Sequence, residues 1–418
     1  MWTTTSYLAR LGLTMGMAIM TGWLLMIFWR ASVAHASPTS PTSAVDPADW
    51  IMLVNLTGTL EMIDTATDTV YGPFLAGELG ESGGALLDVA ITPDGRTALI
   101  SNFGYQAVYF VDVTQPPTPS VITSVTLPLL AEDIALTHDG RYAVVSDGGF
   151  ESPIVSVDVL SRTVAYTLSL PALNAQAVDI APDGTVIVAD FWNGTLHTLL
   201  IDDGGVLTLT GTYTHTLTPD GQVGGAIIPH PTNIAVAPDG QTVIVCDGFA
   251  YDWPSNTRFN TAIYQIVAPG VLSFTDVITG LTRAPQSVAF SPDGQEAYLH
   301  GNSGNTELDD TDELAVLSID GPGQVRLQAN GAADLLRITE GQLFGVDTIA
   351  VVNGKAYLGY PMTFIEWSTP NFVPIVDLFS GTTITRVVSD LPTGIAVIPA
   401  PKPPEPIVFS LWLPIVFQ

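Results

Sequence analysis

Cysteine is almost missing from this sequence, because Cys246 is the only one among 418 residues. An internal disulfide is therefore excluded, and the fold must be stabilised by packing. Basic residues are scarce as well, with 12 Lys and Arg against 41 Asp and Glu and a formal net charge of −29. A surface with this charge repels nucleic acids and anionic membranes, so we expect no nucleic-acid partner.

The common motifs of catalytic and cofactor sites are also missing. The chain has no zinc-ligand spacing, phosphate-binding loop, haem motif or dinucleotide fingerprint. The run Gly80–Gly84 matches Gly-x-Ser-x-Gly, but a glycine-rich loop surrounds it instead of the strand and helix that a nucleophile elbow requires. His215, His230 and His300 have no spacing that places two of them together. No cofactor is certain from the sequence.

The N-terminus contains the one long apolar run, residues 11–29, which holds no charge and lies between Arg10 and Arg30. The small-x-small sequence Ala34-His35-Ala36 follows it, so we predict a signal peptide over 1–36 that is cleaved after Ala36. The run is near the length of a membrane span, and an uncleaved signal anchor is the alternative. Residues 37–48 are a Ser/Thr/Pro linker. We therefore expect a secreted, cell-envelope or surface protein.

Proline and glycine are plentiful, and both punctuate a repeat. In residues 87–111, short apolar runs surround Pro93-Asp94-Gly95. The proline presets φ, and the glycine takes the positive φ of a hairpin turn. A turn glycine recurs at positions 95, 140, 184, 240, 294 and 354. The shortest spacings, about 45 residues, equal the period of a four-stranded propeller blade.

Seven apolar inner strands align within this repeat. Their cores are Val89–Ile91, Ile134–Leu136, Val178–Ile180, Ile234–Val236, Val288–Phe290, Ile349–Val351 and Ile395–Val397. Residues 51–64 match a second and third strand without an inner strand before them, and residues 393–398 match an inner strand with nothing after it. We predict an all-β, seven-bladed β-propeller over 49–399, in which N- and C-terminal strands share and close the first and last blade.

The strand ends resemble a known repeat. Second strands end in Ser-Asn102 and Ser-Asp147, and third strands end in Asp64 and Asp112. These endings are similar to the YVTN-type repeat of lactonase-like and WD-like propellers. The resemblance implies varied roles, among them lactone hydrolysis, dehydrogenase subunits that bear a cofactor, and binding without chemistry. Its lactone-hydrolysing members carry Pro-Arg-His before an inner strand, whereas residues 230–233 read His-Pro-Thr-Asn and lack the arginine.

Three long loops are predicted on the face opposite the Pro-Asp-Gly turns, over residues 248–261, 301–313 and 360–372. Long loops within a regular repeat are where binding usually occurs. Their aromatic residues predict a stacking surface for a protein or carbohydrate ligand, and the alternative is that they pack on one another. The candidate ligand-binding residues are Phe249, Tyr251, Trp253, Phe259, Tyr360, Phe364 and Trp367.

A metal site is the second candidate. Asp88, Asp133 and Asn233 precede inner-strand cores, and Asp179 lies within one, at the position of a small residue. Oxygen ligands that converge on the ring axis would suit Ca²⁺ or another divalent cation. The alternative is that these residues form structural hydrogen bonds, because Asp and Asn cap turns. A buried carboxylate at position 179 needs a partner or an ion.

The remaining segment, residues 400–418, is a Pro-rich spacer and an apolar tail too short to span a bilayer. It is either an envelope-attachment tail or packs on the propeller. Three functions follow. The first is an exported, monomeric binding or scaffold protein that uses the long-loop face. The second is a metal-dependent lactone or ester hydrolase. The third is a propeller subunit that docks a partner enzyme.

Overall fold

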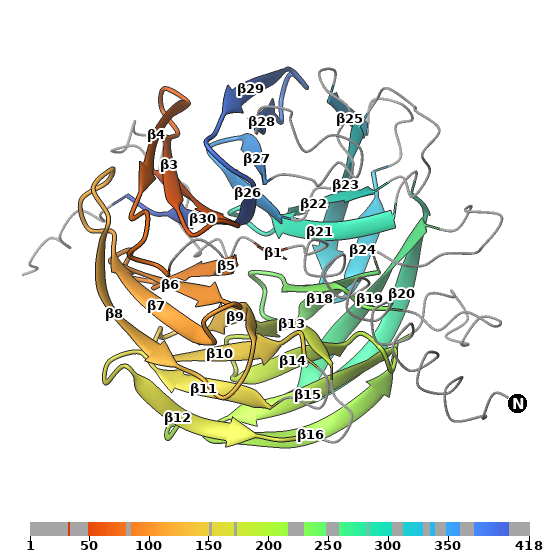
Figure 1. The fold of residues 1–418 in the computed structure, drawn as a ribbon. Coiled ribbons are helices and arrows are strands. Elements are labelled where there is room, and N and C mark those ends of the chain that lie inside the picture. The colour runs from red at the N-terminus through yellow and green to blue at the C-terminus, as the bar shows by residue number, and fades with distance from the viewer. Residues whose placement is uncertain are drawn as a thin grey trace, which may run out of the picture.

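The computed structural model describes residues 32–33, 49–80, 85–149, 153–170, 174–215, 230–247, 259–281, 284–302, 312–328, 335–338, 348–359 and 372–400. These residues form strands and turns in a ring of seven sheets (Figure 1). The predicted seven-bladed β-propeller is confirmed. Within these ranges, no helix has the length and apolar character needed to cross a membrane.

Each blade is an antiparallel sheet whose strands run in order from the ring axis outward. Blade 1 is β30 (Pro392–Ile398), β2 (Trp50–Asn55), β3 (Leu60–Asp64) and β4 (Thr69–Phe74). Blade 2 is β5 (Leu86–Ile91), β6 (Thr97–Asn102), β7 (Ala107–Asp112) and β8 (Ser120–Thr126). Blade 3 is β9 (Ala131–Leu136), β10 (Tyr142–Asp147), β11 (Ile154–Asp158) and β12 (Thr163–Leu168). Blade 4 is β13 (Ala175–Ile180), β14 (Thr185–Asp190), β15 (Thr195–Ile201) and β16 (Leu207–Thr214).

Three blades complete the ring. Blade 5 is β17 (Asn233–Val236), β18 (Thr242–Cys246), β19 (Phe259–Ala268) and β20 (Val271–Leu281). Blade 6 is β21 (Ala284–Phe290), β22 (Glu296–Asn302), β23 (Asp312–Gly321) and β24 (Gln324–Leu327), and β25 (Leu335–Ile338) also pairs with β23. Blade 7 is β26 (Thr348–Val352), β27 (Lys355–Gly359), β28 (Phe372–Asp377) and β29 (Thr383–Val387).

The turns between first and second strands have the predicted chemistry. Gly95 and its counterparts at 140, 184, 240, 294 and 354 all have φ between +68° and +85°. In blade 2, Gly95 N donates to Thr92 O at 2.8 Å, and the Asp94 carboxylate accepts from Arg96 N at 3.1 Å. These turns lie at one end of blades 2 to 7. We call this end the turn face, and the opposite end, where second strands join third strands, the loop face.

The ring closes as predicted, with the last strand supplying the inner strand of blade 1. β30 pairs with β2 in antiparallel register from Trp50↔Ile398 to Val54↔Gly394 (Figure 1). The pairing removes two sheet edges that would otherwise be exposed. At the turn face, Ala400 N donates to Asp49 Oδ1 at 2.8 Å. The two ends of the propeller therefore meet at the turn face.

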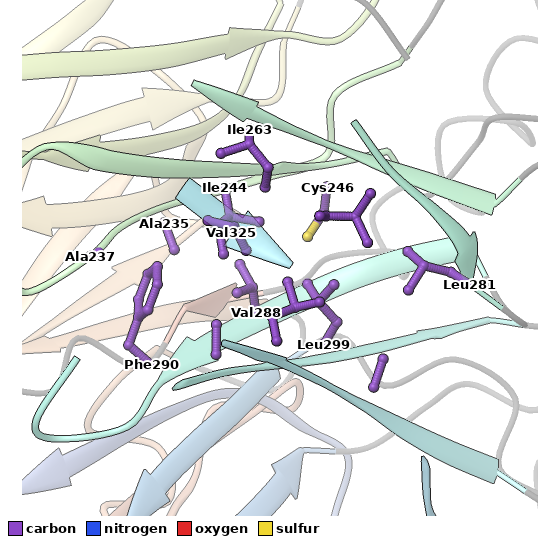
Figure 2. Packing of buried hydrophobic residues seen from close by; sticks show 14 residues of the cluster. Ala235, Ala237, Ile244, Cys246, Ile263, Leu281, Val288, Phe290, Leu299 and Val325 are labelled. Atoms are coloured by element: carbon purple, nitrogen blue, oxygen red, sulfur yellow. The ribbon is translucent and has the colours of Figure 1, made fainter. Parts of the chain in front are cut away.

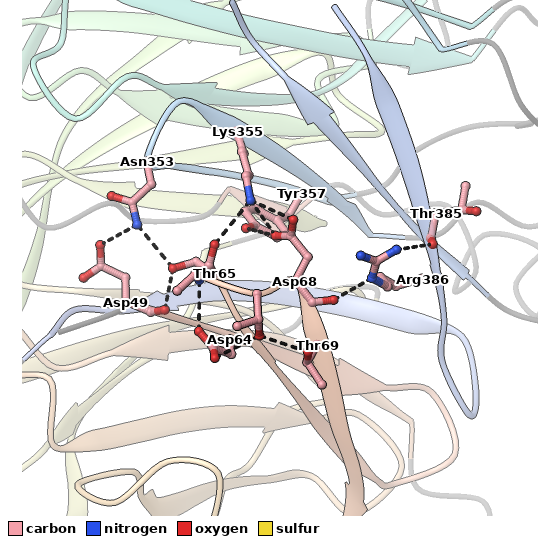
Figure 3. Close-up of polar contacts among 12 residues, drawn as sticks. Asp49, Asp64, Thr65, Asp68, Thr69, Asn353, Lys355, Tyr357, Thr385 and Arg386 are labelled. Atoms are coloured by element: carbon pink, nitrogen blue, oxygen red, sulfur yellow. Dashed lines mark hydrogen bonds and ion pairs between the residues drawn. The ribbon is translucent and has the colours of Figure 1, made fainter. Parts of the chain in front are cut away.

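Side chains between blades 7 and 1 add a second closure, which Figure 3 shows. Lys355 Nζ lies 2.8 and 2.7 Å from the two carboxylate oxygens of Asp68, and Tyr357 Oη donates to Asp68 Oδ1 at 2.9 Å. Arg386 Nε donates to the Asp68 carbonyl at 2.6 Å. One residue of blade 1 is thus held by three side chains of blade 7. Burial raises the pKa of Tyr357, and the neighbouring Asp68 acts in the same direction.

The core consists of apolar layers between neighbouring blades. Figure 2 shows the layer of blades 5 and 6, where Ala235 and Ile244 face Val288 and Leu299. Small residues at the centre of the inner strands let the sheets approach closely near the axis. Cys246 lies in this layer, fully buried and unpaired. Packing therefore stabilises the described fold without a disulfide.

One short strand lies inside the predicted signal peptide. The backbone of β1 (Ser32–Val33) pairs in parallel with β26, in the register Ser32↔Thr348. It also lies beside the inner strands of blades 1, 2, 5 and 6, near the centre of the ring (Figure 1). Cleavage after Ala36 would remove β1 from the mature chain. The rest of the predicted signal peptide, the 37–48 linker and the tail beyond Ala400 lie outside the described residues.

Candidate functional site

Three of the four predicted metal ligands make hydrogen bonds from one blade to the next. Asp88 Oδ2 accepts from Ile134 N at 3.1 Å, and Asp133 Oδ2 accepts from Val178 N at 2.8 Å. Both carboxylates are buried, and both acceptor bonds reach the inner strand of the following blade. We call such a contact an inter-blade staple. It satisfies a backbone donor that the antiparallel ladder leaves unpaired.

Asp179 makes the same contact from a different position. Its Oδ2 accepts from Val236 N at 2.7 Å, and its Oδ1 accepts from Ile180 N at 2.7 Å. Asp179 lies two residues further along its strand than the position that corresponds to Asp133. Because side chains alternate along a strand, a shift of two residues keeps the carboxylate on the same face of the sheet. This explains a carboxylate where the other blades carry a small residue, because the partner that it needs is a backbone N–H.

Asn233, the fourth predicted ligand, is the first residue of β17 and is buried. The four residues therefore lie on four consecutive inner strands, those of blades 2 to 5. In the part of the chain that the structure describes, no three His, Cys, Asp or Glu residues are arranged to hold a metal ion. Divalent-cation binding stays a prediction, and the observed contacts of Asp88, Asp133 and Asp179 are structural.

The aromatic residues predicted from the long loops fall mostly outside the described residues. These are Phe249, Tyr251, Trp253, Tyr360, Phe364 and Trp367. Phe259 begins β19, where its backbone pairs with Leu281, and its side chain is not described. Whether these residues form a stacking surface therefore stays a prediction.

A different aromatic group lies on the loop face, between blades 4 and 5. Phe191 and Trp192 follow β14, and His230 precedes β17. The His230 ring stacks on Phe191 with a centroid distance of 4.7 Å and an interplanar angle of 25°. Trp192 meets Phe191 edge-on at 4.9 Å and His230 at 6.0 Å. Phe191 is buried, whereas Trp192 and His230 are half-buried. We call these three residues the blade-4 platform.

Backbone contacts fix the orientation of His230. Its Nδ1 lies 2.8 Å from the carbonyl oxygen of Phe191. Because a carbonyl only accepts hydrogen bonds, Nδ1 carries the proton. In the neutral ring, Nε2 is then the nitrogen with the lone pair. The platform thus combines an aromatic surface with a hydrogen-bond acceptor.

A buried carboxylate accepts a hydrogen bond from the backbone N–H of His230. Asp247 Oδ2 accepts from His230 N at 2.7 Å and lies 3.9 Å from His215 Nε2. The His215 Nδ1 lies 3.2 Å from the hydroxyl of Tyr264. Burial lowers the pKa of His215 to about 3, so this ring is neutral at physiological pH. The backbone N–H of His230 and the ring of His215 therefore both lie near the same carboxylate oxygen, a proximity that no sequence spacing predicted.

The blade-4 platform was also missed from the sequence, for a physical reason. Phe191 and Trp192 lie in a short turn, whereas the sequence prediction considered only aromatic residues in long loops. The Phe191 carbonyl and the His230 ring are 39 residues apart and meet only because two blades pack together. The available signal was an aromatic pair directly after the strand-end residue Asp190.

Comparisons with known proteins show the fold. No family model matches the chain, and no curated protein sequence does. A functionally unknown protein from Desulfotomaculum acetoxidans is similar with a TM-score of 0.64 and 18% identity, over 84% of this chain and 98% of that one. The Pseudomonas aeruginosa periplasmic gluconolactonase gives 0.61 and 15%, over 84% and 99%. Kuenenia stuttgartiensis hydrazine synthase gives 0.54 and 14%, over 84% and 98%.

These similarities confirm a propeller with lactonase-like neighbours among known structures. Identities of 18% or less do not carry an activity from one protein to another, and one propeller fold serves unrelated functions. The YVTN-type resemblance stays a prediction, because no family model matches. A function for this chain has to be argued from its own side chains.

Proposed function

We propose that this protein is an exported binding protein whose loop face takes a ligand with a hydroxyl-bearing ring, such as a sugar. The blade-4 platform carries the proposal. A half-buried tryptophan offers a face on which the C–H side of a sugar ring stacks, and the His230 Nε2 accepts a hydrogen bond from a ring hydroxyl. Phe191 and Asp247 hold both groups in place, so little ordering is needed on binding.

The export of the protein rests on the apolar N-terminal run and the Ala34-His35-Ala36 site. A periplasmic gluconolactonase among the similar structures is consistent with such a location. Carbohydrates are accessible ligands for a protein outside the cytoplasm. The net charge of −29 favours an uncharged ligand over an anionic one.

Substitutions in the platform test the proposal. Titration calorimetry with neutral oligosaccharides should show binding to the wild-type protein. We expect Trp192→Ala to weaken this binding about tenfold or more, which corresponds to roughly 1.4 kcal/mol. The matched control is Phe379→Ala, which removes an aromatic ring at the turn face, where Phe379 lies over Gly354. Equal affinities for wild type and Trp192→Ala would refute the site.

A pair of histidine variants separates the two functions of His230. The Asn side-chain amide in His230→Asn occupies the position of Nδ1 and keeps the hydrogen bond to Phe191 O, but it removes Nε2. His230→Ala removes both. If the ligand donates to Nε2, both variants bind weakly while only His230→Ala also loses stability. If His230 only supports Trp192 through the packing of its ring, a third variant, His230→Phe, which keeps a ring without a nitrogen, binds like the wild type.

A second candidate is a lactone hydrolase, in which His230 Nε2 would take a proton from the attacking water. The proton on Nδ1 favours it, because the neutral ring then carries on Nε2 the lone pair that a general base needs. Sugar lactones are rings of similar size to the proposed ligands and also carry hydroxyl groups. Proton release from a panel of aldonolactones decides between the candidates: turnover that His230→Asn abolishes supports hydrolysis, and binding without turnover supports the binding protein.

A further inference from the structure

A second aromatic group lies on the loop face of blade 2, in the turn that corresponds to the Phe191–Trp192 turn of blade 4; Tyr105 is the third residue after its strand, whereas Trp192 is the second. Phe103 and Tyr105 are in the turn between β6 and β7, as Phe191 and Trp192 are between β14 and β15. The Tyr105 side chain is 44% exposed, which makes it one of the few large exposed rings on this face in the described part of the chain. We call Tyr105 the blade-2 platform.

Neighbouring groups hold Tyr105 in position. Asn102 Oδ1 accepts from Tyr105 N at 3.0 Å, and Asn102 Nδ2 donates to Leu79 O at 2.7 Å. The ring lies over Gly80, where an added Cβ would come within 2.6 Å of it. Gly80 also has a φ of +110°, so both the contact with the ring and the backbone conformation exclude a side chain there. The Tyr105 ring therefore packs against Gly80 and is partly exposed to solvent.

Blade 3 lies between the two platforms. Its loop begins with Gly148 and Gly149, and the Nδ2 of Asn174 donates to both of their carbonyls at 3.0 Å. An added Cβ at Gly148 would meet the Glu132 carboxylate, so this position requires glycine. Neither residue has a side chain, so the described part of this loop places no bulky group between the platforms.

Charge restricts what could lie across this surface. Six basic residues have described side chains: Arg96, Arg141, Arg162, Arg326, Lys355 and Arg386. The first four lie in or beside turns of the turn face, and the last two form the closure between blades 7 and 1. The described loop face therefore offers no cation to pair with a polyanion. A polymer bound here would be neutral or carry amino groups.

We propose that the ligand is a neutral glycan chain, and that it spans blades 2 to 4 with one ring on Tyr105 and another on Trp192. This inference rests on the proposed function and specifies its ligand as a chain instead of a single ring. Two fixed platforms on one face, with one blade between them, suit a linear chain whose rings repeat. Two weak stacking contacts on one chain raise the affinity because the second forms within the complex.

The experiment compares short and long oligosaccharides. The probes are disaccharides and hexasaccharides of β-1,4-linked glucose and of N-acetylglucosamine, titrated into the purified protein. We expect the hexasaccharide of at least one series to bind tenfold or more tightly than its disaccharide. Tyr105→Ala should remove this difference and leave disaccharide binding within twofold, whereas Trp192→Ala should weaken binding at both lengths.

The outcomes separate the two proposals. If Trp192→Ala weakens binding but affinity does not rise with length, or Tyr105→Ala has no effect on the hexasaccharide, the chain model is wrong and the binding site stands. If no probe of either series binds, both proposals are wrong. Tyr105→Phe is the control, because it keeps the ring and should behave like the wild type if stacking is the cause.

Discussion

The inter-blade staple of Asp133 makes a prediction about stability that also tests the metal hypothesis. Asp133 Oδ2 accepts from Val178 N at 2.8 Å, and Oδ1 accepts from Ile134 N at 3.1 Å. In Asp133→Ala, Ile134 N keeps an acceptor, because Asp88 Oδ2 also lies 3.1 Å away. Val178 N loses the carboxylate that accepts its hydrogen bond. An unpaired buried donor costs about 1–3 kcal/mol.

We therefore expect Asp133→Ala to lower the free energy of unfolding by about 1–3 kcal/mol. Asp133→Asn keeps a carbonyl oxygen for Val178 N, so its cost should be under about 1 kcal/mol. Urea unfolding at equilibrium measures both, as a shift in midpoint at unchanged slope. Both shifts should be the same with calcium and with a chelator, because backbone donors need no ion.

A different pattern would refute this reasoning. If chelator lowers the stability of the wild type but not that of Asp133→Ala, the carboxylate binds a metal ion, and ligand linkage explains its contribution. The staple would also be contradicted if Asp133→Asn were as unstable as Asp133→Ala. The Asn amide oxygen keeps the hydrogen-bond acceptor and removes the charge, so equal losses would mean that the charge is what stabilises the fold.

Three further predictions follow from the described contacts. Lys355→Met should lower the free energy of unfolding in urea by about 1–2 kcal/mol, because its partner Asp68 stays largely buried. Arg326→Met removes an exposed pair with Asp320 and should lower it by under about 0.5 kcal/mol. Equal costs would contradict a closure role for Lys355. Burial raises the pKa of Glu61 above its ordinary value, so its contribution to stability is full below the unfolded pKa and is lost as pH rises through the folded one. Glu61→Gln should therefore gain stability over the wild type at pH 7 and lose this gain in acid, as followed by unfolding from pH 4 to 8; a gain that does not change with pH would be inconsistent. Burial raises the pKa of the Cys246 thiol, so the native protein should not react with a thiol reagent until it is unfolded in urea, and rapid native labelling would show that blades 5 and 6 separate.

Features that repeat along the chain were predictable from the sequence. The turn glycines recur with the blade period. Each has a positive φ that its own turn requires, so no contact with another blade is needed to predict it. The closure was predictable because residues 51–64 and 393–398 are complementary fragments of one repeat. Local chemistry and repeat count were sufficient for both, and they determine most of this fold.

Contacts between blades were not predictable in the same way. The spacing of 45 residues places Asp88 and Asp133 at equivalent positions, but it does not say whether a carboxylate points at an axial ion or at the next blade. The observed bonds to Ile134 and Val178 decide this only in three dimensions. The same limit hid the blade-4 platform, whose His230 and Phe191 belong to different blades.

The distribution of polar groups separates the structural parts of the ring from the proposed binding surface. Buried carboxylates such as Asp133 accept from the neighbouring blade, and Lys355 and Arg386 hold the closure. These groups are already paired within the protein, so recruiting them to a ligand would break contacts that support the ring. At the blade-4 platform, by contrast, His230 Nδ1 makes the internal contact, which leaves Nε2 as the ring nitrogen for a ligand. A functional group that is held by one atom and presents another is the arrangement a binding site needs. For this reason His230 and Trp192, rather than the inner-strand acids, are the residues to substitute first.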